Sequence, residues 1–186
     1  MGTDTAARRR VGVCGKVCTM AAEPSHWSGY AAALAELARQ ARTDTILILE
    51  ETPERHLTWS PRGTRNHILW HAGHCVCVGD VLGVELLSGR SELPPGWNDL
   101  FAMGTDPGFS RSNPPARRRL VDLLREQHRR LLELLAAATE ADLTRRVWER
   151  FMVADRIVHG LHDEARHSGE MYLLLKMIRA GAAGRA

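Results

Sequence analysis

Apolar residues recur along most of the chain at the three- and four-residue spacing of amphipathic helices. In the segment from Ser25 to Glu51 they fall at positions 34, 37, 38, 41 and 49, which is close to the helical period of 3.6. Ser25 stands before this run and is suited to cap it, because its hydroxyl can accept a hydrogen bond from the first turn. The pattern predicts a first helix over about residues 25–51.

Three more helical segments follow. Two prolines and a glycine interrupt the chain at residues 52–63, and a second helix is expected from about Thr64 to about Ser88. This segment is apolar nearly all round, which predicts a central position. A third helix with a leucine stripe is expected over residues 116–138, and a last helix from about Val153 to Arg179. The sequence shows no strand pattern and no internal repeat.

The segment between the second and third helices has a different character. Residues 89–115 hold five of the eight prolines and no sustained period, so they form a long crossover. The apolar side chains of Trp97, Leu100, Phe101 and Met103 indicate that this crossover packs against the helices. Four long helices with one long crossover predict an all-α fold, a four-helix bundle over residues 25–181. Residues 1–24 are then expected to be a flexible extension and residues 182–186 a tail.

The amino-acid composition and net charge disfavour nucleic acid and membranes as partners. The chain has 186 residues, of which 44% are hydrophobic, enough for one domain with a core. Its net charge of +3 is too small to favour a nucleic-acid partner. The apolar runs are shorter than the ~18 residues of a membrane helix, and the N-terminal segment has no apolar stretch typical of a secretory leader. No membrane partner is expected.

The four cysteines indicate a reduced protein. Cys75 and Cys77 lie at alternate positions of one predicted helix and point apart, which disfavours a disulfide between them. Cys14 and Cys18 have a spacing that could clip a metal, although a disordered extension is the alternative interpretation. This cysteine usage predicts a cytoplasmic location.

The last helix carries a dense polar stretch, "HGLHDEARHSGE", over residues 159–170. Each helical residue advances by about 100°, so Asp163 and His167 lie within about 40° of each other, at the edge of the apolar face. That face is expected to include Ile157, Leu161, Ala165, Tyr172 and Leu175. His159 and Glu170 continue the Asp163 stripe, whereas His162 is about 140° from His167 and cannot easily share a ligand with it.

The second helix contributes three more histidines on one side. In "NHILWHAGH", His67, His71 and His74 fall within about 60° of arc. One of these imidazoles with Asp163 and His167 would make a set of two histidines and one carboxylate with open positions, as a catalytic metal site requires. Zn(II), Fe(II), Ni(II) and Mn(II) all suit such ligands. The alternative is that the histidines are hydrogen-bonded core residues and that "HDEARH" is a solvated face with i,i+4 pairs.

Three motifs in this order resemble the DinB/YfiT-like superfamily of bacterial metal-binding four-helix bundles. They are "LTWSPRGTRNHILWHAGH", "LPPGWNDLF" and "HDEARHSGE" with "MYLLLK", and the resemblance covers roughly residues 27–180. It implies a metal ligand at His74, four residues after Trp70, and another at His167, before Ser-Gly-Glu. The family's third ligand is a histidine at the position that Asp163 occupies here. The implied set is therefore His74, Asp163 and His167; alternatively the site is degraded, or His71 or His159 supplies the missing ligand.

The resemblance also implies a class of chemistry. Relatives include metal-dependent transferases that use low-molecular-weight thiols such as mycothiol or bacillithiol, and metal-dependent hydrolases. Glu170 or His71 would then accept a proton or orient a ligand, and Trp97 and Phe101 would wall the pocket. A small-molecule substrate and a homodimer are expected. The alternative is a non-catalytic metal-binding or structural, stress-related dimeric bundle, in which a closed site would recruit His71 or His159 as a fourth ligand.

Overall fold

Four long helices lie side by side in the computed structural model, which describes residues 26–110 and 113–181. The elements are α1 (His26–Glu51), a 3-10 turn (Glu54–His56), α2 (Ile68–Gly79), a π-helical stretch (Asp80–Val84), α3 (Glu85–Ser88), α4 (Trp97–Phe101), α5 (Arg117–Ala137), α6 (Glu140–Thr144), β1 (Arg146–Val147), β2 (Phe151–Met152) and α7 (Val153–Arg179). The predicted extension with Cys14 and Cys18, the cap Ser25 and the tail 182–186 lie outside the described residues. The predicted all-α bundle is confirmed.

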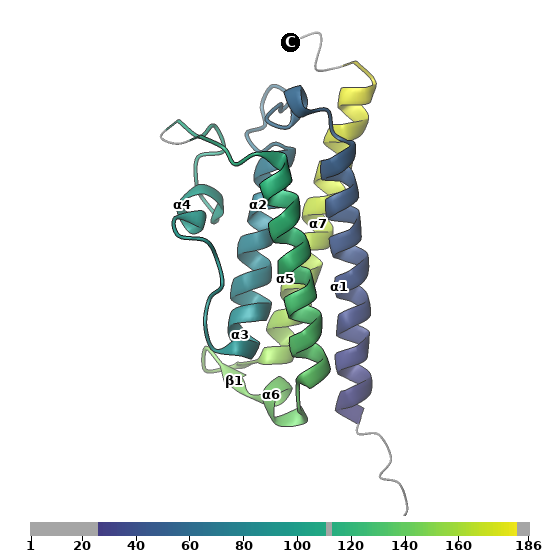
Figure 1. Ribbon diagram of the computed structural model, residues 1–186, viewed down its shortest axis with the longest axis vertical. Coiled ribbons are helices and arrows are strands. Elements are labelled where there is room, and N and C mark those ends of the chain that lie inside the picture. The colour runs from purple at the N-terminus through teal and green to yellow at the C-terminus, as the bar shows by residue number, and fades with distance from the viewer. Residues whose placement is uncertain (1–25, 111–112, 182–186) are drawn as a thin grey trace, which may run out of the picture.

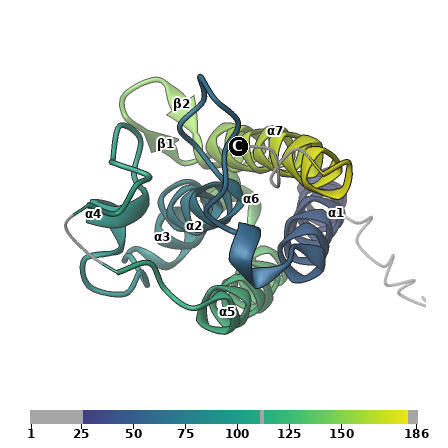
Figure 2. The same ribbon diagram turned by 90° about the horizontal axis from the view of Figure 1, so that it is seen from above.

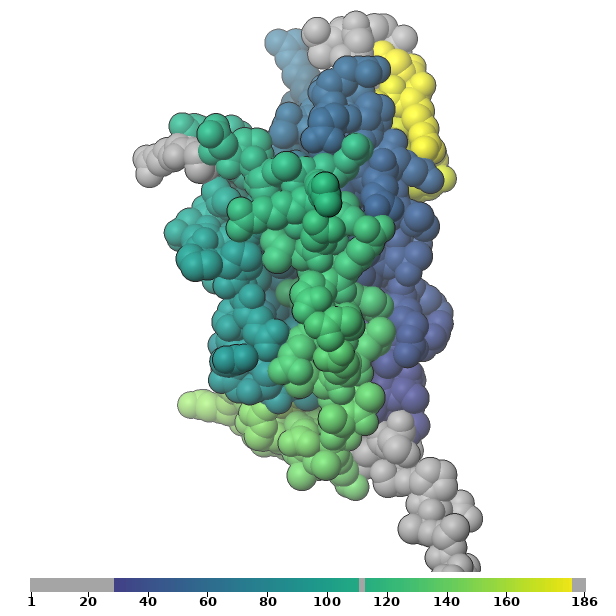
Figure 3. Space-filling model, viewed as in Figure 1, coloured from purple at the N-terminus to yellow at the C-terminus, as the bar shows by residue number. Residues whose placement is uncertain are grey.

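Each long helix packs against two neighbours. Helix α1 contacts α5 and α7, and α2 contacts the same two helices from the opposite corner. Figure 2, which looks along the bundle, shows the four helices around a common centre, with α4 outside them beside α2. Figure 3 shows the crossover, in teal, and α5, in green, covering the face turned to the viewer. No described helix is long and apolar enough to cross a membrane.

Helix α2 begins four residues later than the sequence pattern predicts. His67 is its N-cap: the backbone there is extended, and its Nδ1 accepts a hydrogen bond from the Trp70 N–H at 3.1 Å. Imidazole acceptors are not among the usual caps, so the local sequence does not mark His67 as the start of a helix. The predicted end at Ser88 is correct, because Gly89 takes the left-handed conformation with φ 82° and ends α3.

Other departures from the predicted pattern are small. Residues 146–152 form a two-stranded antiparallel pair, Arg146 opposite Met152 and Val147 opposite Phe151, too short to leave a periodic signal. Leu37, Met103, Ala165 and Tyr172 were expected to pack but are exposed. The buried face of α7 runs instead through Ile157, Gly160, Leu161, Glu164, Ser168, Met171, Leu174, Leu175 and Ile178.

A buried ion pair divides the core into two apolar clusters. Arg42 of α1 donates from Nε to Glu164 of α7 at 2.7 Å and from Nη2 at 3.0 Å. Its remaining donors reach the Leu124 carbonyl and the Gln127 side chain of α5, and Gln127 in turn donates to the Val76 carbonyl of α2. These hydrogen bonds satisfy the buried charges and connect all four long helices at one level.

The crossover is hydrogen-bonded to α2 and to the π-helical stretch that follows it. Asp80 accepts hydrogen bonds from the Ser91 hydroxyl at 2.6 Å and from the Glu92 N–H at 3.0 Å. Further along, the indole of Trp97 donates to the Gly73 carbonyl at 3.1 Å. The Phe101 ring covers Gly73 so closely that a Cβ there would lie 2.2 Å from it. Gly73 therefore lets the crossover approach the helix that carries the histidines.

Candidate metal centre

Helices α2 and α7 bring the predicted ligands together at their interface. His74 Nε2 lies 3.7 Å from Asp163 Oδ2, and His167 Nε2 lies 3.4 Å from the same oxygen. One atom from each of these three residues falls within 4.8 Å of the other two. Donor atoms that each lie about 2.1 Å from a tetrahedral metal are roughly 3.4 Å from one another. The three side chains therefore form a group that could hold a metal ion.

The orientation of His74 is set by the crossover. Its Nδ1 lies 2.7 Å from the Phe101 carbonyl oxygen, and because that oxygen can only accept, Nδ1 carries the proton. The lone pair of the neutral ring is then on Nε2, the atom that faces Asp163. Nε2 is buried and has no hydrogen-bond partner in the structure. A buried acceptor without a partner is costly, and a cation at this place would satisfy it.

Trp70 holds the plane of the His74 ring. The two rings stack with centroids 4.9 Å apart and an interplanar angle of 7°. The Trp70 indole donates to the Thr105 hydroxyl at 3.0 Å, and that hydroxyl donates to the Leu100 carbonyl at 2.9 Å. The tryptophan in the quoted motif thus has a positioning contact, while Thr105 and the Phe101 carbonyl left no signal in the sequence pattern.

His71 and Glu170 lie on the other side of His167. The Nδ1 atoms of His71 and His167 are 2.8 Å apart, and His71 Nε2 lies 3.3 Å from Glu170 Oε2. His71, His167 and Glu170 form a second group that could hold a metal ion, and it shares His167 with the first. Of the two residues predicted to assist catalysis, His71 therefore contacts the ligand His167 directly, and Glu170 contacts His71.

Burial favours the neutral form of His71 and of His167. Desolvation lowers the pKa of His71 to about 3, and repulsion from a protonated His167 adds to this shift. Burial also lowers the pKa of His167, although the Asp163 carboxylate opposes it. Neutral imidazoles at pH 7 offer lone pairs to a cation, as a metal ligand must.

The other candidate residues lie elsewhere. His67 is held as a helix cap, with Nε2 2.7 Å from the Pro107 carbonyl, and His159 and His162 are exposed on α7. The rings of Trp97 and Phe101, expected to wall a pocket, are instead buried at 3% and 0% exposure.

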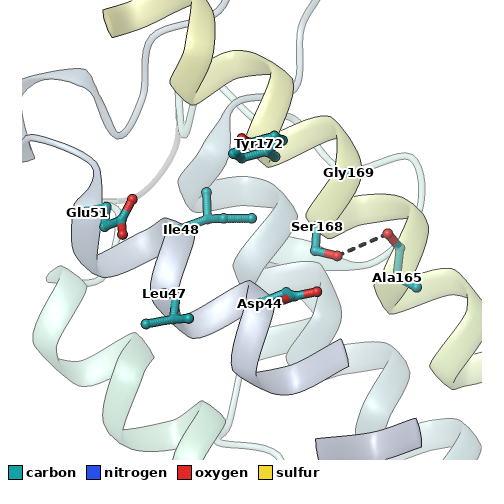
Figure 4. Close-up of a pocket in the computed structure, with 8 residues that line it drawn as sticks. All are labelled: Asp44, Leu47, Ile48, Glu51, Ala165, Ser168, Gly169 and Tyr172. Carbon is teal, nitrogen blue, oxygen red and sulfur yellow. Dashed lines mark hydrogen bonds between the residues drawn. The ribbon is translucent and has the colours of Figure 1, made fainter. Parts of the chain in front are cut away.

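A separate groove runs between α1 and α7, with a volume of about 430 Å³. Figure 4 shows its lining: Asp44, Leu47, Ile48, Glu51, Ala165, Ser168, Gly169 and Tyr172. The Ser168 hydroxyl points along α7 and donates to the Ala165 carbonyl at 3.0 Å. None of the predicted ligands lines this groove, so it is distinct from the centre at the α2–α7 interface.

Comparison with known families shows which superfamily the chain belongs to. The family model of the DinB superfamily matches residues 37–171, which is more than half of the chain. The chain belongs to the DinB superfamily. The matched residues include α2, the crossover and the part of α7 that carries Asp163, His167 and Glu170, so the resemblance drawn from the three motifs is confirmed. No curated protein matches this DinB superfamily chain.

Proposed function

We propose that this DinB superfamily protein binds one divalent metal through His74, Asp163 and His167 and uses it to activate a small-molecule thiol or water. The observation that carries the proposal is the buried Nε2 of His74, which has no hydrogen-bond partner and faces the other two ligands. A metal bound there would lower the pKa of a thiol or of water and so provide a nucleophile at neutral pH. Zn, Ni, Fe and Mn all suit the ligand set.

The His71–His167 contact supports this assignment. His167 can offer its Nε2 lone pair to a cation when its proton is on Nδ1, and Nδ1–H then donates to His71 Nδ1. His71 in turn carries its proton on Nε2, which faces the Glu170 carboxylate. Glu170 has a side chain that is 54% exposed, so it can accept a proton from His71 and pass it to water.

The reaction that we propose is a transfer to an electrophilic carbon. The nucleophile loses its S–H or O–H proton, its sulfur or oxygen forms a bond to carbon, and the leaving group departs with the electron pair. A low-molecular-weight thiol of the mycothiol or bacillithiol type is the proposed co-substrate, with water as the variant that gives hydrolysis. Three ligands leave coordination positions open for such a reactant, which favours an enzyme over a closed structural site.

The test is the metal content of the purified, untagged protein, measured by elemental analysis. We expect close to one divalent metal per chain, and its loss in His74→Ala/His167→Ala. The matched control is His159→Ala/His162→Ala, which removes two exposed histidines from α7 and should keep the metal. No metal as purified, and none bound after adding Zn(II), Ni(II), Fe(II) or Mn(II), would refute the proposal.

Turnover needs its own measurement. The metal-loaded protein is incubated with 1-chloro-2,4-dinitrobenzene and a panel of low-molecular-weight thiols, and release of chloride is compared with that from the metal-free protein. A metal-dependent rate would support the transferase. Metal binding without any metal-dependent transfer or hydrolysis would favour the non-catalytic metal-binding bundle. Sedimentation of the same samples tests the expected homodimer.

A further inference from the structure

A second cavity, of about 380 Å³, opens beside His71 and Glu170. It lies between the C-terminal half of α7 and the loop that precedes α2. Its lining residues are Pro61, Thr64, Arg65, Asn66, His71, Glu170, Leu173, Leu174 and Met177. Cavities of this size accommodate small molecules. Since His71 also contacts the ligand His167, the inner end of the cavity adjoins the metal centre.

The two walls of this cavity differ in chemistry. Helix α7 presents Leu173, Leu174 and Met177, and Leu173 is 56% exposed although it is a large apolar side chain. The loop wall presents Thr64, Arg65 and Asn66 instead. A ligand that covers the leucine would remove apolar surface from water, and it would meet a cation on its other side. The lining therefore suits a molecule with an apolar body and one anionic group.

Arg65 is available to pair with such an anion. Within residues 26–110 and 113–181, its guanidinium forms one ion pair, with the Asp106 carboxylate at 3.4 Å, and its side chain is 76% exposed. Asp106 already accepts hydrogen bonds from the Ser110 hydroxyl and from the Gly108 N–H, which hold its pKa at about 2. An exposed ion pair of this length contributes little, whereas an arginine can bind a carboxylate through two parallel hydrogen bonds.

The position of Glu170 favours one orientation of a ligand in the cavity. His71 is 3% exposed and marks the inner end, and the Glu170 carboxylate, 3.3 Å from His71 Nε2, would repel an anion there. The anionic group of a ligand is therefore favoured at Arg65, near the mouth, and its uncharged part near His71. This orientation would place the reacting end of a substrate toward the metal centre.

We infer that this cavity is the substrate site and that the substrate is a small apolar carboxylate, bound by Arg65 and by the apolar wall at Leu173. The inference rests on the proposed metal-dependent function of the adjoining centre. It adds the chemical class of the molecule that the nucleophile attacks. The residues that recognise this substrate are separate from the predicted metal ligands, so the two proposals can fail independently.

The test is isothermal titration calorimetry on the full-length protein, both metal-free and zinc-loaded. The probes are 4-phenylbutyrate and its uncharged analogue 4-phenylbutan-1-ol. Arg65→Gln should weaken binding of the carboxylate about tenfold and leave that of the alcohol unchanged, because one charged contact is lost. Leu173→Gln should weaken both probes several-fold.

Each variant has a matched control. Arg62→Gln removes a neighbouring exposed arginine that does not line the cavity, and Leu47→Gln removes a similarly exposed leucine from the α1–α7 groove. Both controls should bind the probes as the unchanged protein does. Loss of binding in Leu47→Gln but not in Leu173→Gln would place the probes in the groove and overturn the inference.

Two further outcomes distinguish failure of the substrate site from failure of the metal-dependent function. If neither probe binds to the folded, zinc-loaded protein, the substrate site is overturned and the metal site is unaffected. Probe binding that depends on Arg65 and Leu173 in a protein that takes up no metal supports the cavity as a binding site and refutes the metal-dependent function. An equal effect of Arg65→Gln on the carboxylate and the alcohol overturns the assignment of the anion.

Discussion

The Nδ1 atoms of His71 and His167 lie 2.8 Å apart across the interface of α2 and α7. At this distance one ring donates a hydrogen bond to the other, so the pair shares one proton between the two nitrogens. A second proton on these facing nitrogens would break the hydrogen bond and place two positive rings in contact. The relationship therefore ties the stability of this interface to the charge of its histidines.

Lowering the pH should destabilise the metal-free protein. Because burial lowers the pKa of His71 from 6.5 to about 3, the unfolded chain binds a proton at this residue between those values and the folded chain does not. The free energy of unfolding should fall with decreasing pH across this window, by up to about 1.4 kcal/mol per pH unit from His71 alone. Urea unfolding from pH 7 to pH 5 measures the slope, and His71→Gln should reduce it. An unchanged slope in His71→Gln would contradict the assignment.

Asp163 and Glu170 should differ in their effect on metal affinity. Asp163→Asn removes the carboxylate between His74 and His167, so we expect a loss larger than the roughly 10–100-fold typical of residues that only orient a ligand. Glu170→Gln, which changes a carboxylate that contacts His71, should stay within that smaller range. Competition with a chelator for Zn(II) measures both variants. The opposite order would place the metal in the group of His71, His167 and Glu170.

Asp163→His offers a complementary check on the same position. It would supply the histidine that the family resemblance places there, and three imidazoles form a set that zinc accepts. We expect this variant to keep close to one metal per chain by elemental analysis. Loss of the metal would mean that an imidazole at position 163 does not fit between His74 and His167, and that the site requires the smaller carboxylate.

Gly73→Ala should weaken both the fold and the metal site. The added Cβ would lie 2.2 Å from Cδ1 of the Phe101 ring, so the ring and its carbonyl, which orients His74, must shift. Overpacking of this kind costs about 1–3 kcal/mol. Gly169→Ala is the control, since nothing lies within 4 Å of a Cβ there, and a mid-helix alanine should add roughly 0.5–1 kcal/mol of stability. Thermal unfolding and zinc affinity measure both; equal stability of the two variants would contradict this packing.

Arg42 should contribute far more to stability than an exposed arginine on the same helix. Arg42→Met leaves the Glu164 carboxylate buried without its partner, which costs about 3–5 kcal/mol. Arg39→Met disrupts only an exposed pair with Glu36, which is worth less than about 1 kcal/mol. The double change Arg42→Met/Glu164→Met should recover most of the loss, because no unpaired charge remains. Urea unfolding of the three variants checks this order, and equal losses in Arg42→Met and Arg39→Met would rule it out.

Much of the helical framework could be read from local spacing. The predicted last helix matches α7 at both ends, and the third predicted helix differs from α5 by one residue at each end. These helices were predictable because apolar side chains on one face recur with the helical period. The start of α2 was not, since the cap is an imidazole whose acceptor role depends on its proton being held at the Pro107 carbonyl.

Part of the candidate site could likewise be predicted from the sequence, and part could not. The 100° advance per residue places Asp163 and His167 on one face of α7, and the family motif points to His74. Neither the spacing nor the motif could place the Phe101 carbonyl against His74, because that contact joins residues 27 positions apart through an irregular crossover. The ion pair of Arg42 and Glu164 joins residues 122 positions apart and likewise left no local pattern.

The sequence by itself determined the helices, the all-α class and the faces that carry imidazoles and carboxylates, because these follow from a repeat within each helix. The tertiary structure decided which faces meet, and at what height. It turned Ala165 and Tyr172 outward, brought His71 against His167, and left Nε2 of His74 facing Asp163. Those relations depend on how distant side chains pack at close-packed density, and no local repeat encodes the rotation of one helix against another.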